Sequence, residues 1–154
     1  MIRVINDNLG RSLHNELYNR LRQACLSLNP EIPPEGVIND WLFRLYNNDP
    51  RLHILINLND QMNGISEHAV IDVVNVYGTN IVYCHQIVKD KPTKDIVDEY
   101  MEYLDKLKEA TAASCIAFTV AKNAKVYEKR YGYQTVRTML VKFDALQSAQ
   151  QKEA

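Results

Sequence analysis

Few glycines, few cysteines and no long apolar run characterise this sequence of 154 residues. It has 5 Gly and 3 Cys, and no stretch reaches the roughly 18 apolar residues of a membrane span. The odd number of cysteines argues against a complete disulfide framework, and their wide spacing lacks the close pairs of zinc or redox sites. We therefore expect Cys25, Cys84 and Cys115 to be reduced, buried and inert, and we expect no metal.

A strong charge of one sign is also missing, because the formal net charge is -1. Such a chain has no field that would attract nucleic acid or an anionic membrane. Residues 1–6 lack the basic region and apolar run of a signal peptide, so we expect a cytoplasmic protein. The sequence has no Gly-x-Ser-x-Gly elbow, P-loop or dinucleotide fingerprint, which argues against those enzyme classes.

The length suits one domain with a single core. We expect this domain to cover residues 1–144, followed by a polar, Gln-rich tail over residues 145–154. Apolar residues at helical spacing predict one helix over residues 9–28 and a second over residues 37–45. A short strand over residues 1–6 is expected to precede them.

From Leu52 the apolar period changes to two, which predicts a strand over residues 52–58. Further strands are predicted over residues 69–77 and 81–88, completing an antiparallel meander. The remaining predicted elements are a helix over 93–110, a strand over 114–120, a helix over 123–130 and a strand over 135–143. A right-handed crossover should place strands 81–88 and 114–120 side by side and parallel. The residues predicted to be largely buried are Trp41, Leu52, Ile54, Ile56, Val74, Val76, Ile116 and Phe118.

The segment from Ala124 to Tyr133, followed by residues 136–142, resembles the late helix, Gly turn and last strand of the GNAT acyltransferase superfamily. The order of predicted elements is similar to that family over nearly the whole chain. The resemblance implies an α/β (α+β) fold, with a mixed, mostly antiparallel central sheet flanked by about four helices. One residue more than the family spacing separates Tyr127 from Gly132.

The expected cofactor loop of that family is missing here. In GNAT enzymes the fourth strand runs into a Gln/Arg-x-x-Gly-x-Gly/Ala loop that holds the pyrophosphate of acetyl-CoA. The equivalent stretch, residues 88–95, has no glycine, and it contains Pro92, Asp90 and Asp95. We therefore expect no cofactor. If acetyl-CoA does bind, the contacts implied by the resemblance are Val88, Lys89, Lys91, Thr93 and Lys94.

Catalytic candidates depend on the same resemblance. The family's acid is a Tyr on the late helix, which matches Tyr127 or, allowing for the extra residue, Tyr131, and both alternatives stay open. Glu67, next to His68, is a candidate general base near a strand start. For each tyrosine we prefer the interpretation as an aromatic that packs the short helix against the sheet, and for Glu67 that of a charged strand end. The four histidines, His14, His53, His68 and His85, are interpreted as structural, because no carboxylate or Cys is placed to complete a metal site.

Two functional hypotheses follow. The preferred one is a degenerate GNAT-like domain acting as a non-catalytic binding or structural protein, as in virion proteins of short-tailed bacteriophages. It would act in the host cytoplasm or be packaged in a virion, with protein partners or self-assembly. The alternative is an acetyl-CoA-dependent N-acyltransferase with an atypical cofactor loop.

Overall fold

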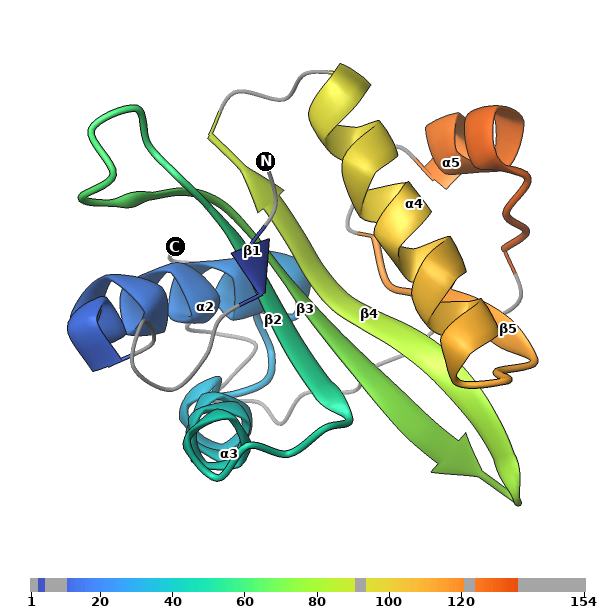
Figure 1. The fold of residues 1–154 in the computed structure, drawn as a ribbon, viewed down its shortest axis with the longest axis horizontal. Helices are drawn as coiled ribbons and strands as arrows, with labels where there is room; N and C mark the ends of the chain where they lie inside the picture. The colour runs from blue at the N-terminus through green and yellow to red at the C-terminus, as the bar shows by residue number, and fades with distance from the viewer. Residues whose placement is uncertain (1–2, 5–10, 91–93, 121–123, 136–154) are drawn as a thin grey trace, which may run out of the picture. The chain divides into compact units, whose positions relative to one another are not determined.

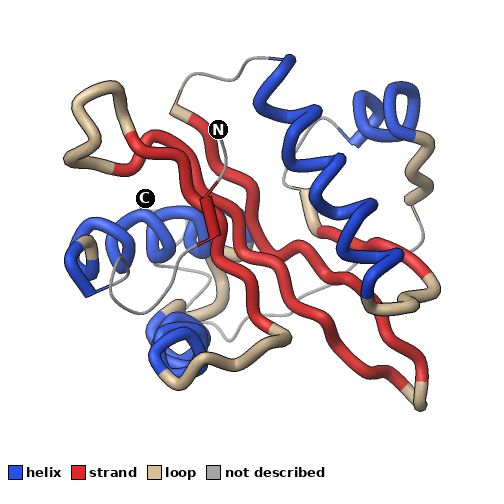
Figure 2. The backbone as a smooth tube through the Cα atoms, viewed as in Figure 1, coloured by secondary structure: helices blue, strands red, loops and turns tan. Residues whose placement is uncertain are grey.

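The computed structural model describes residues 3–4, 11–90, 94–120 and 124–135 (Figures 1 and 2). It divides into two compact units, one ending at Thr119 and the other beginning at Val120. The two units are therefore treated separately. The predicted domain end at residue 144, the tail over 145–154 and nearly all of the strand over 135–143 lie outside these ranges.

The helices and strands follow the predicted order. They are β1 (Arg3–Val4), α2 (His14–Leu28), α3 (Glu35–Tyr46), β2 (Leu52–Leu58), β3 (Ile65–Val76), β4 (Thr79–Lys89), α4 (Lys94–Ala110) and β5 (Cys115–Phe118), with α5 (Ala124–Tyr131) in the second unit. The strands form one sheet in the order β1-β2-β3-β4-β5. All neighbouring pairs are antiparallel except β4 and β5, whose predicted parallel pairing is confirmed.

Helices α2 and α3 cover one face of the sheet. Alternation along β2 places Leu52, Ile54 and Ile56 on this face, where they are buried as predicted. The cluster they belong to also contains Leu17, Leu21, Ile38, Trp41, Leu42, Leu45, Ile65 and Val70. Two amphipathic helices and the strand that follows them thus form the first half of the core.

Helix α4 packs against the opposite face. A hydrogen bond of 2.7 Å joins Tyr103 of α4 to His53, which alternates with the buried residues of β2. Tyr100 and Leu104 are both 0% exposed, in agreement with the predicted apolar stripe of this helix. Figure 1 shows α4 running along β4 and β5.

Four of the predicted core residues are less buried than expected. Val76 is 42% exposed, so its predicted burial is wrong, and Val74, Ile116 and Phe118 are half-buried. The register explains the two valines, because Leu52, the first residue of β2, pairs with Asp72 of β3. The β3–β4 hairpin therefore extends past β2 and its helices. Ile116 and Phe118 lie on β5, the outermost strand in the sheet order of this unit.

The cysteines are free, but they do not share one environment. Cys84 is buried as predicted, and burial raises the pKa of its thiol to about 12. Cys25 is half-buried and Cys115 is exposed at the start of β5, so the prediction of a buried thiol is wrong for Cys115. Over the ranges that the structure describes, no helix is long and apolar enough to cross a membrane.

Candidate active site

Strands β4 and β5 separate part-way along β4. Their parallel pairing runs from Ile81 with Cys115 to Cys84 with Phe118, whereas β4 continues to Lys89. Next to the last pair, the hydroxyls of Tyr83 and Thr119 lie 2.8 Å apart in a hydrogen bond. Over the described part of the chain, the second half of β4 therefore pairs with β3 alone. We call this opening between β4 and β5 the fork.

A β-bulge lies where the fork begins. Val70 and Ile71 are consecutive on β3, yet they pair with Gln86 and Cys84 of β4, which leaves His85 as the extra residue. In a regular strand His85 and Gln86 would face opposite sides of the sheet. The bulge turns both side chains toward the α2–α3 face, where they line the same cavity.

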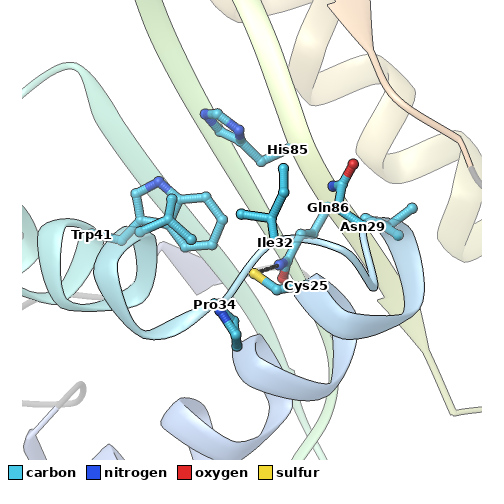
Figure 3. Close-up of a pocket in the computed structure, with 9 residues that line it drawn as sticks. Cys25, Asn29, Ile32, Pro34, Trp41, His85 and Gln86 are labelled. Atoms are coloured by element: carbon cyan, nitrogen blue, oxygen red, sulfur yellow. Dashed lines mark hydrogen bonds between the residues drawn. The ribbon is translucent and has the colours of Figure 1, made fainter. Parts of the chain in front are cut away.

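This cavity has a volume of about 180 Å³ and lies between β4, the end of α2, the loop that follows it, and α3. Figure 3 shows Trp41 on one side of it and Gln86 and Asn29 on the other, with His85 at one end. The remaining lining residues are Cys25, Leu28, Ile32, Pro34 and Val37. We call it the α2–α3 cavity.

His85 is held between two rings and a carboxylate. Its ring centroid is 5.0 Å from that of Trp41 and 4.7 Å from that of Tyr83, which stands edge-on to it. His85 Nε2 lies 3.8 Å from Asp72 Oδ2 and is buried without a hydrogen bond. Since Nε2 faces Asp72, Nδ1 is the ring nitrogen left to meet a ligand.

Asp72 is itself fixed by Arg44. The guanidinium of Arg44 donates two hydrogen bonds of 2.8 Å to the carboxylate of Asp72 and one of 2.7 Å to Asp49. Burial alone would raise the pKa of Asp72, but the hydrogen bonds and positive charge of Arg44, helped by His85, lower it well below its usual range. Asp72 is therefore a permanent negative charge beside His85 at neutral pH.

A second polar network lies on the same face and fixes Gln86. The side chain of Gln86 makes a hydrogen bond of 2.9 Å with His68 Nε2, and it donates to Cys25 Sγ at 3.0 Å and to the Leu21 carbonyl at 3.3 Å. Arg20 continues the network, donating to His68 Nδ1 at 3.4 Å and to Asp90 at 2.9 Å. The α2–α3 cavity and the end of β4 thus share one chain of contacts.

The other histidines fit the structural interpretation. His14 contacts the Tyr46 hydroxyl, His53 bonds to Tyr103, and His68 bonds to Gln86. His85 differs from them because its partner is a charge and its neighbour is a cavity. The sequence interpretation missed this difference, since neither glycine nor proline marks the bulge. Among the described residues, no group of three or more His, Cys, Asp or Glu could hold a metal ion.

Neither a protein-family model nor a curated protein matches the sequence. The structure resembles a predicted acetyltransferase from Clostridium acetobutylicum solved with acetyl-CoA, with a TM-score of 0.68, 17% identity, and coverage of 96% of this chain and 97% of that chain. It also resembles glucosamine-6-phosphate N-acetyltransferase from Arabidopsis thaliana, with a TM-score of 0.66, 12% identity, and coverage of 94% and 97%. The chain has a GNAT-like fold.

This GNAT-like fold confirms the expected α+β class and the mostly antiparallel sheet. A third neighbour, ribosomal-protein-alanine N-acetyltransferase from Brucella melitensis biovar Abortus 2308, has a TM-score of 0.61, 14% identity, and coverage of 93% and 99%. At such low sequence identities, the structural similarity establishes the fold alone, and any activity depends on the site.

The residues that the GNAT resemblance nominated for acetyl-CoA lie partly at the fork. Val88 and Lys89 end β4 and pair across the sheet with His68 and Glu67. Lys94 begins α4, and its side chain lies outside the described residues, as do Lys91 and Thr93. Their role as cofactor contacts stays a prediction.

Of the predicted catalytic residues of the GNAT pattern, Glu67 belongs to the same unit as the α2–α3 cavity but does not line it. Glu67 is 7% exposed and accepts a hydrogen bond of 2.9 Å from the Ser66 hydroxyl. Glu67 and His68 are consecutive on β3 and therefore face opposite sides of the sheet, and burial and then the charge of Glu67 raise the pKa of Tyr100 on α4. The ring centroids of Tyr127 and Tyr131 lie 6.1 Å apart, with the rings tilted, within the second unit. An acid role for either tyrosine stays a prediction.

Proposed function

We propose that the chain is an acyl-CoA-dependent N-acyltransferase in which His85 is the general base. The observation that carries this proposal is the position of His85 on the bulge where β4 and β5 separate. Asp72 lies beside its Nε2, and the α2–α3 cavity lies beside the rest of its ring. A histidine between a fixed carboxylate and a cavity is a common arrangement for removing a proton.

The fork suits the arm of acyl-CoA. When bound, acyl-CoA supplies an activated thioester carbonyl, and its pantetheine arm carries amide groups that can pair with a strand edge. The β4 residues from His85 to Val88 offer such an edge beyond the last β5 pair, in the manner of β-strand addition. Because residues 88–95 contain no glycine, phosphate contacts would come from side chains such as Lys89 and not from a glycine-rich backbone loop.

The negative charge of Asp90, which argues against cofactor binding in the sequence, is partly neutralised in the folded chain. Asp90 places a negative charge at the end of β4, where it would repel a diphosphate. Arg20 of α2 lies 2.9 Å from this carboxylate in an ion pair. The charge of Asp90 is therefore compensated locally by a residue that is distant in the sequence.

The chain's own residues divide the proton chemistry between them. His85 Nδ1 would accept the proton of an acceptor amine, and Asp72 would stabilise the resulting imidazolium through Nε2. Arg44 keeps the Asp72 carboxylate in place with two hydrogen bonds. The rings of Trp41 and Tyr83 fix the orientation of the imidazole.

The test is His85→Gln with His53→Gln as a matched control, since His53 bonds to Tyr103 on the other face of the sheet. Thiol release from acetyl-CoA would be measured with a panel of amines. Loss of general-base catalysis should lower the rate by roughly 10²- to 10⁴-fold in His85→Gln. His53→Gln should retain nearly the original rate, and calorimetry should show that both variants still bind acetyl-CoA. Equal rates for the two variants would contradict the proposed role.

A second candidate is a non-catalytic binding or structural module, and the glycine-free stretch over residues 88–95 favours it. Under this alternative the chain acts through protein partners or self-assembly, and a virion role is one form of it. Calorimetric titration with acetyl-CoA separates the two. Micromolar binding supports the enzyme, whereas no binding at millimolar concentrations supports the module.

A further inference from the structure

We propose that the α2–α3 cavity binds a small monoamine whose body is uncharged, apolar and about the size of one ring. This inference deepens the proposed function, because the bound amine would be the acyl acceptor. Binding itself, however, requires neither a cofactor nor turnover.

The lining of the cavity sets the character of the ligand body. Leu28, Ile32, Pro34, Val37 and Trp41 present carbon surface from α2, the loop and α3. Gln86, one of the polar lining residues, already uses its amide on His68, Leu21 and Cys25. Most of the cavity wall therefore favours a ligand that buries apolar area, and it offers few polar contacts.

Charge restricts the ligand further. None of the lining residues is Asp, Glu, Lys or Arg. The carboxylate of Asp72 lies 3.8 Å from His85 Nε2, but its side chain is only 9% exposed and both oxygens are bonded to Arg44. A phosphate, a carboxylate or a second ammonium on the ligand would lose its hydration in this cavity without gaining a partner.

The volume limits the size. At about 180 Å³ the cavity is smaller than the sites of roughly 300 to 1,000 Å³ that hold drug-sized ligands. It is comparable in size to an engineered apolar cavity of about 150 Å³ in another protein, which accommodates one benzene molecule. One ring, or a branched chain of similar bulk, therefore fills it.

The polar end of the cavity can receive one amino group. With Nε2 beside Asp72, Nδ1 is the nitrogen of His85 that can accept a hydrogen bond, and Asn29 lies on the same lining. The Trp41 ring, 5.0 Å from that of His85, can also attract a cation to its face. An amine of this kind would place its nitrogen next to the proposed base.

Fluorescence provides a direct binding test, because Trp41 is the only tryptophan of the chain. Phenethylamine is the probe. Cadaverine supplies a second ammonium without a ring, and phenylacetate supplies the ring with a negative charge. Phenethylamine should change the Trp41 emission and bind at least tenfold more tightly than either control. Equal or tighter binding of cadaverine or phenylacetate, or no binding of phenethylamine, would overturn the inference.

Filling the cavity should abolish this preference. Ile32 is 50% exposed at the cavity, and Met62, in the β2–β3 loop, is 52% exposed and does not line it. Calorimetry should therefore show at least tenfold weaker phenethylamine binding for Ile32→Trp and no change for Met62→Trp. Val37→Phe is a second filling variant in case Ile32→Trp does not fold. Unchanged affinity in a folded filling variant would contradict the inference.

The outcomes separate this inference from the proposed function. Phenethylamine binding without any thiol release from acetyl-CoA would support the inference and contradict the enzyme. Acyl transfer to other amines without phenethylamine binding would support the enzyme and contradict the inference.

Discussion

The two halves of β4 differ in a way that locates the site. From Ile81 to Cys84 the strand lies between β3 and β5, and its side chains alternate regularly. From His85 onward it pairs with β3 alone within the described residues, and the bulge places His85 and Gln86 on one face. The first half is scaffold, and the second half combines an open backbone edge with a histidine, a fixed carboxylate and a cavity.

The comparison shows why a strand interruption is useful. A bulge leaves most of the ladder intact while it reorients one side chain and ends the pairing on one side. Here Asp72 of β3 pairs with Tyr83, just before the bulge, so the carboxylate is held firmly next to the displaced His85.

The largest expected effect comes from breaking the support of the second half. Arg44→Ala leaves Asp72 buried without its counter-ion, and loss of one partner of a buried pair costs about 3 kcal/mol or more of unfolding free energy. Arg22→Ala is the control, because its pair with Glu35 is about half exposed and should contribute less than about 1 kcal/mol. Urea unfolding measures both, and similar losses in the two variants would contradict the described role of Arg44.

Acid should destabilise the network next to the cavity. Burial lowers the pKa of His68 from 6.5 to about 4 in the folded chain. Between these values the unfolded state binds more protons, so the free energy of unfolding falls by about 3 kcal/mol as the pH drops from 6.5 to 4. His68→Gln should flatten most of this slope in pH-dependent urea unfolding. A slope unchanged by the substitution would show that His68 is not its source.

The smallest expected effect concerns the hydrogen bond between Tyr83 and Thr119, next to the last β4–β5 pair. Tyr83→Phe removes the hydrogen bond to Thr119, which is exposed, and should cost less than about 1 kcal/mol of unfolding free energy. A double-mutant cycle with Thr119→Val should show coupling of a few tenths of a kcal/mol. A loss of several kcal/mol would mean that Tyr83 supports more of the sheet than this contact.

Periodicity predicted much of the fold. The alternation over Leu52 to Leu58 and the helical stripe around Tyr100 and Leu104 predicted both the elements and their buried faces. The predicted burial of Val76 was wrong because its local pattern is that of a buried strand. The sequence does not show that β2 begins opposite Asp72 and therefore does not extend alongside Val76. A local pattern reports which residues could be buried, and long-range register decides which of them are.

The candidate site was much harder to predict. The resemblance to GNAT proteins directed attention to Tyr127 and Tyr131, which belong to the second unit, and to Glu67, which does not line the α2–α3 cavity. His85 depends on a bulge and on Asp72, thirteen positions earlier in the chain, so neither composition nor spacing could distinguish it from the other histidines. Arg20 and Asp90 are likewise brought together only by folding.

The central claim is that the second half of β4 is a ligand-binding edge, and amide hydrogen exchange with and without acetyl-CoA tests it most directly. We predict that acetyl-CoA slows amide exchange in the stretch from His85 to Val88. The amides from Ile81 to Cys84, where β4 already has a paired strand on each side, should change little. Unchanged exchange throughout β4 at saturating acetyl-CoA, or equal slowing of both halves, would contradict it.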